Sequence, residues 1–326
     1  MVRIIIMDQL FFHNICRIKT MMKISRLALY AVLVWGALLN LAAAQELEPR
    51  RWSHVPVETN FIGVGYINTS GDVSFDPVLL IEDATVDINT VSATYLHSFD
   101  WSGKTARIDV RVPYQKAVWK GLLEGAPAKA VREGIDDPRI RLSVNFIGAP
   151  ALKGKEYQAY RASHTTNTVV GAALAVTLPL GQYKEDKLLN LGQNRFIIRP
   201  QIGAVHTRGP WSFELTGSAF LYTDNDEFFN GNKLEQKPLL ALQAHVIRSF
   251  RRGIWASLSA GAVRAGESTI NGEEKDDTKE DFLYALSAGL PVTRTTSVKI
   301  AYVRGRTGRN VGSDTDNIGI GFIKAF

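Results

Sequence analysis

Basic side chains recur at every second position of several short segments, a spacing that would gather them on one surface. Arg107 and Arg111 flank Asp109 in one segment, and Arg139 and Arg141 begin another. Residues of equal parity lie on the same face of a β-strand, so these guanidinium groups would share a surface if the two segments pair. Guanidinium offers a planar fork to carboxylates and a flat face to aromatic rings. The charged residues with this parity are Arg107, Asp109, Arg111, Arg139, Arg141, Arg195, Arg199, Glu214 and Lys299.

Histidines, serines and clustered carboxylates give weaker chemical signals. The histidines after position 44 show neither H-x-x-x-H nor H-E-x-x-H spacing, which leaves a metal site without support. His245 would face Ser257 or Ser259 on a neighbouring strand, but no local nucleophile motif accompanies the pair. Acidic residues crowd 267–281 and 224–227, and calcium favours such oxygen ligands, yet their spacing does not match an EF-hand loop. We therefore predict no catalytic residue, no metal and no cofactor, and expect the acidic stretches to be solvated loops.

The first 44 residues have the pattern of an export leader. A short basic stretch precedes an apolar run over 27–41, and three alanines follow it. This order is typical of a cleaved signal peptide, and the run is shorter than the roughly 20 residues of a membrane-spanning helix. We predict that 1–44 comprise an upstream extension and a signal peptide, with Gln45 as the mature start.

Removing the leader changes what the composition implies. The formal net charge falls from +6 to +2, because the leader holds five basic residues and one acid. The charge therefore gives no support for a nucleic-acid partner, which would need a basic stripe in the mature chain. The single cysteine, Cys16, and all four methionines lie within the first 22 positions, so the mature chain cannot form a disulfide.

The rest of the chain shows period-two alternation over about ten residues at a time, which is typical of β-strands. In 105–112, for example, Ile108 and Val110 alternate with Arg107, Asp109 and Arg111. The predicted strands are 59–68, 86–97, 105–112, 139–146, 166–178, 195–207, 211–219, 237–248, 254–264, 281–290, 296–304 and 315–326.

Two all-β folds produce this alternation, and the lengths of the connections favour one of them. A soluble periplasmic ligand-binding β-sandwich has an apolar inside, whereas a membrane barrel has an apolar outside and a polar lumen. Outer-membrane barrels combine short periplasmic turns with long outer loops. The short connections are 98–103, 208–210, 249–253 and 291–295, and the long ones are 69–85, 179–194, 223–236, 265–280 and 305–314. The connection 148–165 is long but falls on the short side, and the pattern does not explain it.

We therefore predict a transmembrane, antiparallel, up-and-down β-barrel over 59–326. Counting gives 12 strands if the stretch 104–121 is one strand bent at Pro113, or 13 segments if that stretch is two, and we predict about 12. An even number places both termini on the periplasmic side, where 45–58 would form a periplasmic N-terminal segment.

Aromatic residues with outward parity are expected to form girdles at the two membrane interfaces. The short-turn girdle would contain Tyr95, Phe146, Trp211, Phe213 and Phe326, and the long-loop girdle Phe196, Phe282 and Tyr284. Phe326 also ends the chain on an amphipathic strand. Such an ending resembles the signal that the bacterial barrel-assembly machinery reads, so this machinery is an expected partner.

Five blocks of the mature chain resemble one transporter family, called "putative MetA-pathway of phenol degradation". The blocks run in order through 59–326 and include Asn60-Phe61-Ile62-Gly63-Val64-Gly65-Tyr66, Ser102-Gly103-Lys104-Thr105-Ala106-Arg107, Asp137-Pro138-Arg139-Ile140-Arg141-Leu142-Ser143-Val144-Asn145, Leu178-Pro179-Leu180-Gly181-Gln182-Tyr183 with Leu191-Gly192-Gln193-Asn194-Arg195, and Tyr222-Thr223-Asp224-Asn225. The resemblance implies an outer-membrane protein of Gram-negative bacteria that passes aromatic or other small compounds.

The expected function is passive passage of a small-molecule permeant through a barrel embedded in outer-membrane lipid and lipopolysaccharide. Seven of the inward charges are positive and two are negative. They predict either a basic ring that selects anions or an internal salt-bridge ladder that fills the lumen, and the sequence leaves both open. An outer-membrane barrel hydrolase is the enzymatic alternative.

Overall fold

The computed structural model describes residues 47–326 except 75–80, 252, 276 and 310. The signal peptide and upstream extension predicted over 1–44 lie outside the described residues. The elements are β1 (Thr59–Ser74), β2 (Ile81–Trp101), β3 (Lys104–Leu123), β4 (Ala126–Ile135), β5 (Arg139–Pro150), α2 (Gly154–Ser163), β6 (Thr166–Thr177), β7 (Ile197–Arg208), β8 (Trp211–Tyr222), β9 (Asn225–Phe228), β10 (Asn232–Gln236), β11 (Leu239–Arg251), β12 (Ile254–Ala265), β13 (Ser268–Ile270), β14 (Glu273–Glu274), β15 (Lys279–Pro291), β16 (Thr296–Thr307) and β17 (Gly312–Ala325). Among these residues, no helix is both long and apolar enough to span a membrane.

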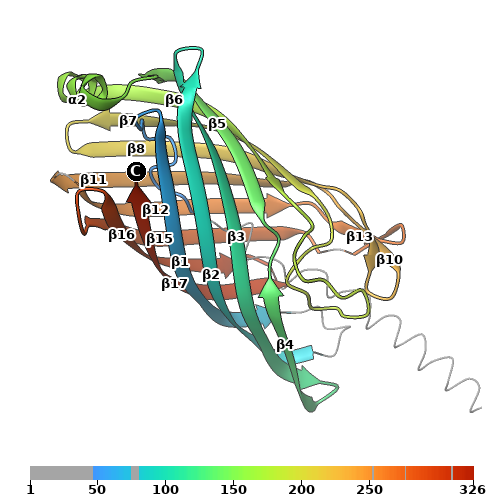
Figure 1. Cartoon of the computed structure of the whole chain (residues 1–326). Helices are drawn as coiled ribbons and strands as arrows, with labels where there is room; N and C mark the ends of the chain where they lie inside the picture. Colours follow the sequence, from blue (N-terminus) through green and yellow to red (C-terminus); the bar gives the residue numbers. More distant parts are fainter. Residues whose placement is uncertain (1–46, 75–80, 252, 276, 310) are drawn as a thin grey trace, which may run out of the picture.

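Within the described residues, twelve strands close into one antiparallel barrel (Figure 1). Each of these strands pairs with the two barrel strands next to it along the chain, and β1 closes the ring by pairing with β17. Phe61 lies opposite Ala325 in this seam, which brings the start of β1 to the last residues of the chain. Every predicted strand falls on one barrel strand, so the predicted fold is confirmed and the β-sandwich alternative is wrong.

The strand β3 continues through Pro113 as one long element and extends past the end of β5. It pairs with β5 over 104–111 and with β4 over 114–123. Proline has no N–H to donate, and β3 changes partner at this residue. The prediction of one strand over 104–121 is confirmed, whereas β4 was not predicted because Lys129 and Glu133 alternate with Val131 and Ile135 on one face.

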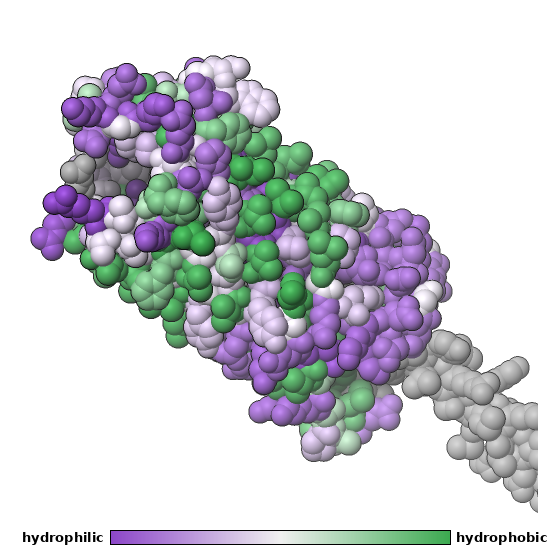
Figure 2. All heavy atoms as spheres, in the orientation of Figure 1, coloured by the Kyte–Doolittle hydropathy of each residue, from purple (hydrophilic) through white to green (hydrophobic). Residues whose placement is uncertain are grey.

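The two faces of the barrel have opposite chemistry. Leu242, Leu258 and Leu286 are exposed on the outer face, while Ser257 and Glu214 are buried on the inner face. In Figure 2, hydrophobic residues form a band around the middle of the visible face, and hydrophilic residues lie at both ends. The apolar side chains are therefore placed to contact the lipid of the bilayer, and polar contacts fill much of the barrel interior.

The connections divide as the sequence predicted, and α2 accounts for the long one on the short side. The turns at 101–104, 208–211 and 251–254 join strands at one end of the barrel, and helix α2 lies at this end (Figure 1). At the other end, β9, β10, β13 and β14 form a small four-stranded sheet. These short strands were not predicted, because charged residues at both parities hide their alternation.

Candidate functional site

The nine charged residues predicted to line the lumen all lie on the inner face of the barrel. Arg111, Arg139 and Lys299 are half-buried and the other six are buried. The β3–β5 register places Asp109 opposite Arg141, and Arg111 opposite Arg139. The register therefore places four arginines, Arg107 and Arg111 on β3 and Arg139 and Arg141 on β5, on adjacent strands; we call this group the arginine wall.

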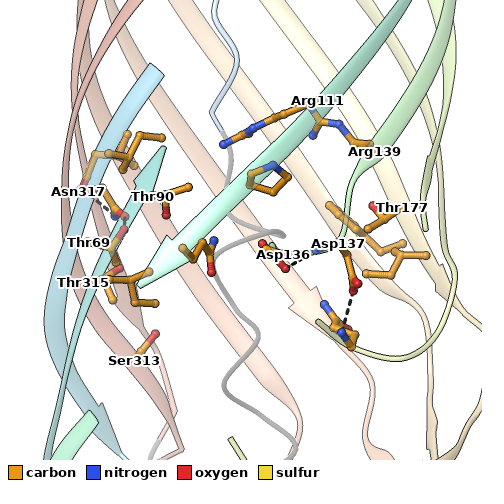
Figure 3. A pocket seen from close by; sticks show the side chains of 18 of the residues that line it. Thr69, Thr90, Arg111, Asp136, Asp137, Arg139, Thr177, Ser313, Thr315 and Asn317 are labelled. Carbon is orange, nitrogen blue, oxygen red and sulfur yellow. Dashed lines mark hydrogen bonds between the residues drawn. The ribbon is translucent and has the colours of Figure 1, made fainter. Parts of the chain in front are cut away.

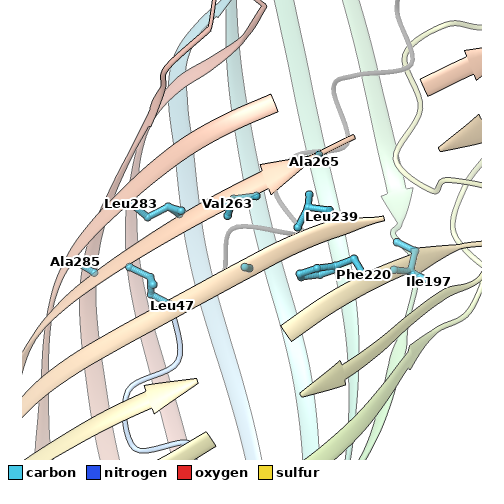
Figure 4. Packing of buried hydrophobic residues seen from close by; sticks show 9 residues of the cluster. Leu47, Ile197, Phe220, Leu239, Val263, Ala265, Leu283 and Ala285 are labelled. Atoms are coloured by element: carbon cyan, nitrogen blue, oxygen red, sulfur yellow. The ribbon is translucent and has the colours of Figure 1, made fainter. Parts of the chain in front are cut away.

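The segment 47–58 lies inside the barrel, whereas the sequence predicted a periplasmic segment over 45–58. Leu47 belongs to a cluster of buried apolar side chains that contains Leu239 on β11, and Figure 4 shows it beside Leu283 and Ala285 on β15. At the other end of the segment, the backbone N–H of Glu58 donates to the carbonyl of Ser98 over 2.7 Å. The described part of this segment thus passes along the lumen, and only its last residues reach the short-turn end. Strand periodicity gave no signal for this, since the segment is not a strand.

Glu48 of this segment is an acid of the lumen that strand periodicity does not predict. Its carboxylate lies 2.7 Å from Nη1 of Arg141, 3.7 Å from Nη1 of Arg139 and 3.6 Å from Nε of Arg51. Asp109 accepts from Nε of Arg141 over 3.0 Å and lies 4.0 Å from Nη1 of Arg51. These residues form one ion network, so this part of the arginine wall is a salt-bridge ladder.

Trp52 fixes the segment to the wall formed by β6, β7 and β8. Its side chain is wholly buried, and the indole Nε1 donates to the hydroxyl of Thr216 over 2.8 Å. The backbone N–H of Trp52 donates to Glu214 over 3.3 Å. Gly171 and Gly203 lie opposite each other beneath the ring, where a Cβ would come within 2.7 Å and 2.1 Å of indole atoms. Glycine at both positions is what leaves room for the indole.

Gly203→Ala is therefore expected to displace Trp52 and to destabilise the folded barrel by about 1–3 kcal/mol through overpacking. The added Cβ would also lie 2.6 Å from the carbonyl of Leu215. Thermal unfolding in detergent measures the stability, and tryptophan emission reports the displacement. Gly217→Ala is the matched control, because its Cβ meets no described atom within 4 Å. If the ring causes the clash, Trp52→Ala should remove much of the penalty in the double variant; equal penalties in both backgrounds would contradict this account.

Helix α2 holds the segment where it leaves the lumen. The ring of His54 lies 4.9 Å from that of Tyr157 and 5.4 Å from that of Tyr160, both on α2. The hydroxyl of Tyr157 donates to the carbonyl of His54 over 2.9 Å, and the N–H of Val57 donates to the carbonyl of Leu152 over 3.0 Å. The long connection 148–165 thus has a structural role that the sequence did not reveal.

A cavity of about 260 Å³ occupies the lumen toward the long-loop end, with Leu47 among its lining residues. Figure 3 shows Arg111, Arg139, Asp136 and Asp137 on one side, and Thr69, Thr315 and Asn317 on the other. The charged residues that line it are Arg111, Arg139, Arg195, Arg199, Lys279, Lys299, Asp136 and Asp137. Six of these are basic and two are acidic, so the cavity has an excess of positive charge. Lys279, Asp136 and Asp137 were not among the predicted residues.

Two of these arginines lie against aromatic rings. The guanidinium carbon of Arg195 is 4.4 Å from the ring centre of Tyr222, and that of Arg199 is 4.4 Å from that of Phe220. The Nη2 of Arg195 also donates to Oε1 of Gln236 over 2.6 Å. Ring contacts and hydrogen bonds keep these cations in fixed positions beside flat apolar surfaces.

The two acidic residues lie in the connection between β4 and β5. Asp137 accepts from the backbone N–H of Gly181 over 2.8 Å and from that of Gln193 over 2.7 Å. Burial raises the pKa of Asp137 despite these bonds. Burial, and then the charge of Asp137, raise the pKa of Asp136 to about 7 although the N–H of Asp137 donates to it. Asp136 is therefore largely uncharged at mildly acidic pH.

The eight residues predicted for the two aromatic girdles are exposed on the outer face of the barrel. Phe326 lies at the barrel seam, where its N–H donates to the carbonyl of Asn60 over 2.9 Å. The acidic loops are paired with lysines, such as Lys237, whose Nζ lies 3.2 Å from Glu267 and 2.8 Å from Glu274. Across the described part of the chain, no three His, Cys, Asp or Glu side chains are placed to hold a metal ion.

The sequence of the chain matches one family model, described as "Putative MetA-pathway of phenol degradation", over residues 51–314. No curated protein matches the sequence.

Solved structures match the fold. The COG4313 outer membrane channel from Pseudomonas putida F1 is 20% identical, with a TM-score of 0.72 over 86% of this chain and 100% of that chain. The transport unit of the autotransporter AIDA-I from Escherichia coli is 10% identical, with a TM-score of 0.47 over 88% of this chain and 95% of that chain. The closed barrel with apolar residues on its outer face is that of an outer-membrane protein.

Proposed function

Because the chain belongs to the "Putative MetA-pathway of phenol degradation" family, we propose that this outer-membrane barrel is a passive channel for small compounds. The P. putida protein of similar fold is described as an outer membrane channel, which supports this proposal. The observation that carries it is the lumenal cavity with its excess of basic residues. A water-accessible basic constriction attracts anions and holds them weakly enough to let them leave.

The permeants favoured by this cavity are anions, and aromatic carboxylates above all. Arg111 and Arg139 lie side by side and can present their donors to a carboxylate. Trp119, Phe220 and Tyr222 also line the cavity and offer flat apolar surfaces to a ring. A neutral phenol lacks the carboxylate charge, so its passage should depend less on the arginines.

The protein acts without catalysis in this proposal. The ring Nδ1 of His245 lies 2.8 Å from the hydroxyl of Ser259, which gives the hydrolase alternative one contact. A nucleophile–base pair also needs a group that orients the base. The other ring nitrogen of His245 has no hydrogen-bond partner among the described residues. The pair is therefore better explained as polar packing of the inner face.

Electrical recording of the purified protein tests the channel. In planar bilayers with a potassium chloride gradient, the reversal potential should show preference for chloride, and benzoate should carry current in place of chloride. A deletion strain should take up benzoate more slowly than its parent when the concentration is low. A barrel that inserts but conducts no ions, together with normal benzoate uptake by the deletion strain, would contradict the proposal.

Two further partners are proposed for the C-terminal end of the chain and for the long loops. Phe326, which directly follows the amphipathic β17, supports recognition by the barrel-assembly machinery, and the lysine- and acid-rich long loops support contact with lipopolysaccharide. Replacing Phe326 with alanine should lower the amount of heat-modifiable barrel in the outer membrane without altering its conductance once it has folded.

The anion preference should fall as pH rises from 6 to 8. Since the pKa of Asp136 is raised to about 7, its carboxyl group is mostly neutral at pH 6 and mostly charged at pH 8. The added negative charge opposes anion entry into the cavity. Lys279 also lines the cavity and could add a pH dependence of its own. The effect of Asp136 is therefore measured as the difference in permeability ratio between wild type and Asp136→Asn. The variant should match wild type at pH 6 and exceed its chloride/potassium permeability ratio at pH 8; parallel curves would rule out Asp136 as the source.

A further inference from the structure

The outer face of the barrel carries an apolar groove of about 1000 Å³. It begins near the short-turn ends of β8 and β11 and crosses β12, β15 and β16 toward β17. Ala256 and Ala288 lie opposite each other on β12 and β15, between larger side chains such as Leu258, Leu286 and Ile300. The two small residues make a depression that an acyl chain can occupy.

Arg248 lies at the short-turn end of this groove, exposed on the face that otherwise meets lipid. Its guanidinium carbon is 5.1 Å from the ring centre of Trp211 and 5.1 Å from that of Phe250. The strand register also places Arg248 directly opposite Ala256. Among the described residues, no carboxylate forms an ion pair with it. A cation on the outer face at the level of the aromatic girdle is expected to have an anionic partner in the bilayer.

The turns beside the groove share its positive charge. The described residues of the connections 208–210, 249–253 and 291–295 include Arg208, Arg251 and Arg294 but neither aspartate nor glutamate. Short turns of outer-membrane barrels face the periplasm, and the leaflet on that side consists of phospholipids. Basic residues near a membrane surface attract anionic lipids. The positive charge of these turns therefore complements an anionic headgroup. Their described residues offer no carboxylate that could pair with the ammonium group of a zwitterionic lipid.

We propose that this groove binds an anionic glycerophospholipid of the inner leaflet. Arg248 donates to the phosphodiester, Trp211 and Phe250 hold the guanidinium group in place, and one acyl chain lies over Ala256 and Ala288. The headgroup class is that of phosphatidylglycerol or cardiolipin. This site is separate from the lumen and does not depend on what the channel passes.

Quenching of tryptophan fluorescence by brominated acyl chains tests the site, because Trp211 lies in the groove. The full mature chain carries Trp101→Phe, which removes another exposed tryptophan. It is reconstituted in phosphatidylcholine with increasing brominated phosphatidylglycerol or brominated phosphatidylethanolamine. The structure predicts a preference for phosphatidylglycerol of about fivefold, the effect of roughly one arginine at a membrane surface. Arg248→Gln should remove this preference.

Two controls make the result specific. Arg304 is another exposed arginine, but its Nε lies 3.9 Å from the carboxylate of Asp316, so Arg304→Gln should keep the preference. Filling the depression with Ala288→Leu should weaken quenching by both lipids, and the heat-modifiable gel shift shows that each variant is folded. Equal quenching by both lipids in wild type, or a preference that survives Arg248→Gln, would overturn the proposal. Loss of the preference in both arginine variants would mean diffuse surface charge without a site and would also overturn it.

Discussion

Replacing Arg111 and Lys299 with glutamate is expected to lower the anion/cation permeability ratio by about tenfold. Both residues line the cavity and are only half-buried, so new carboxylates there stay in contact with water. The formal charge of the lining residues falls from +4, six basic and two acidic residues, to zero in the variant. A cavity without net charge should no longer prefer anions. The reversal potential in a salt gradient measures this directly.

A graded series separates charge from structural damage. Arg111→Gln with Lys299→Gln changes the lining charge by half as much, so its permeability ratio should fall between those of wild type and the glutamate variant. Arg304→Gln removes a charge from the outer face and should leave the ratio unchanged. If the glutamine and glutamate variants gave equal ratios, the shape of the cavity rather than its charge would set the selectivity.

Much of the barrel could be predicted because each strand by itself must place apolar residues on one face and polar residues on the other. Lipid on one side and polar contacts on the other force apolar and polar residues to alternate, so Leu258 and Ser259 already reveal their faces. The closing seam was predictable for the same reason, since an even number of strands returns the chain to its start. Strand β4 escaped prediction because Lys129 and Glu133 share a face with Val131 and Ile135, which hides the alternation.

The sequence predicted the charged residues on the barrel wall of the candidate site, but not the N-terminal segment that lies in the lumen. Inward parity identified Arg139 and Arg199 from local spacing alone. Glu48 and Trp52 come from an irregular segment, and their partners Arg141 and Thr216 lie far along the chain. No periodicity connects such residues. The adjacent glycines Gly171 and Gly203, inside otherwise regular strands, were a signal that another group approaches the wall closely.

The N-terminal segment divides the lumenal arginines into two groups that the sequence could not distinguish. Arg107 and Arg141 bind the N-terminal segment, through the carbonyl of Arg51 and the carboxylate of Glu48, and therefore act as scaffold. Arg111 and Arg199 line the cavity instead. The arginine wall thus changes role along its length, from a salt-bridge ladder at Arg141 to a candidate selectivity element at Arg111.

Glu48→Gln is expected to loosen the segment 47–58 and to raise the single-channel conductance. The carboxylate of Glu48 pairs with Arg51, Arg139 and Arg141, and in the variant Asp109 remains as the carboxylate beside Arg51 and Arg141. Removing one partner from a buried ion network costs about 3–5 kcal/mol, because charges are left uncompensated. The segment occupies part of the lumen, so weaker seating should widen the conducting path. Planar-bilayer recording measures the conductance and its fluctuations.

Glu58→Gln is the matched control on the same segment. Glu58 pairs with Lys153 at 2.5 Å, but both side chains are more than half exposed, and exposed pairs contribute little to stability. This variant should conduct like wild type. A chain that lacks residues 47–56 gives the upper limit of the conductance, because this part of the segment is then absent from the lumen beside Thr216 and Ser143. If Glu48→Gln and the shortened chain both conducted like wild type, the segment would not restrict the pore, and the constriction would have to lie in the cavity lined by Arg111 and Arg199.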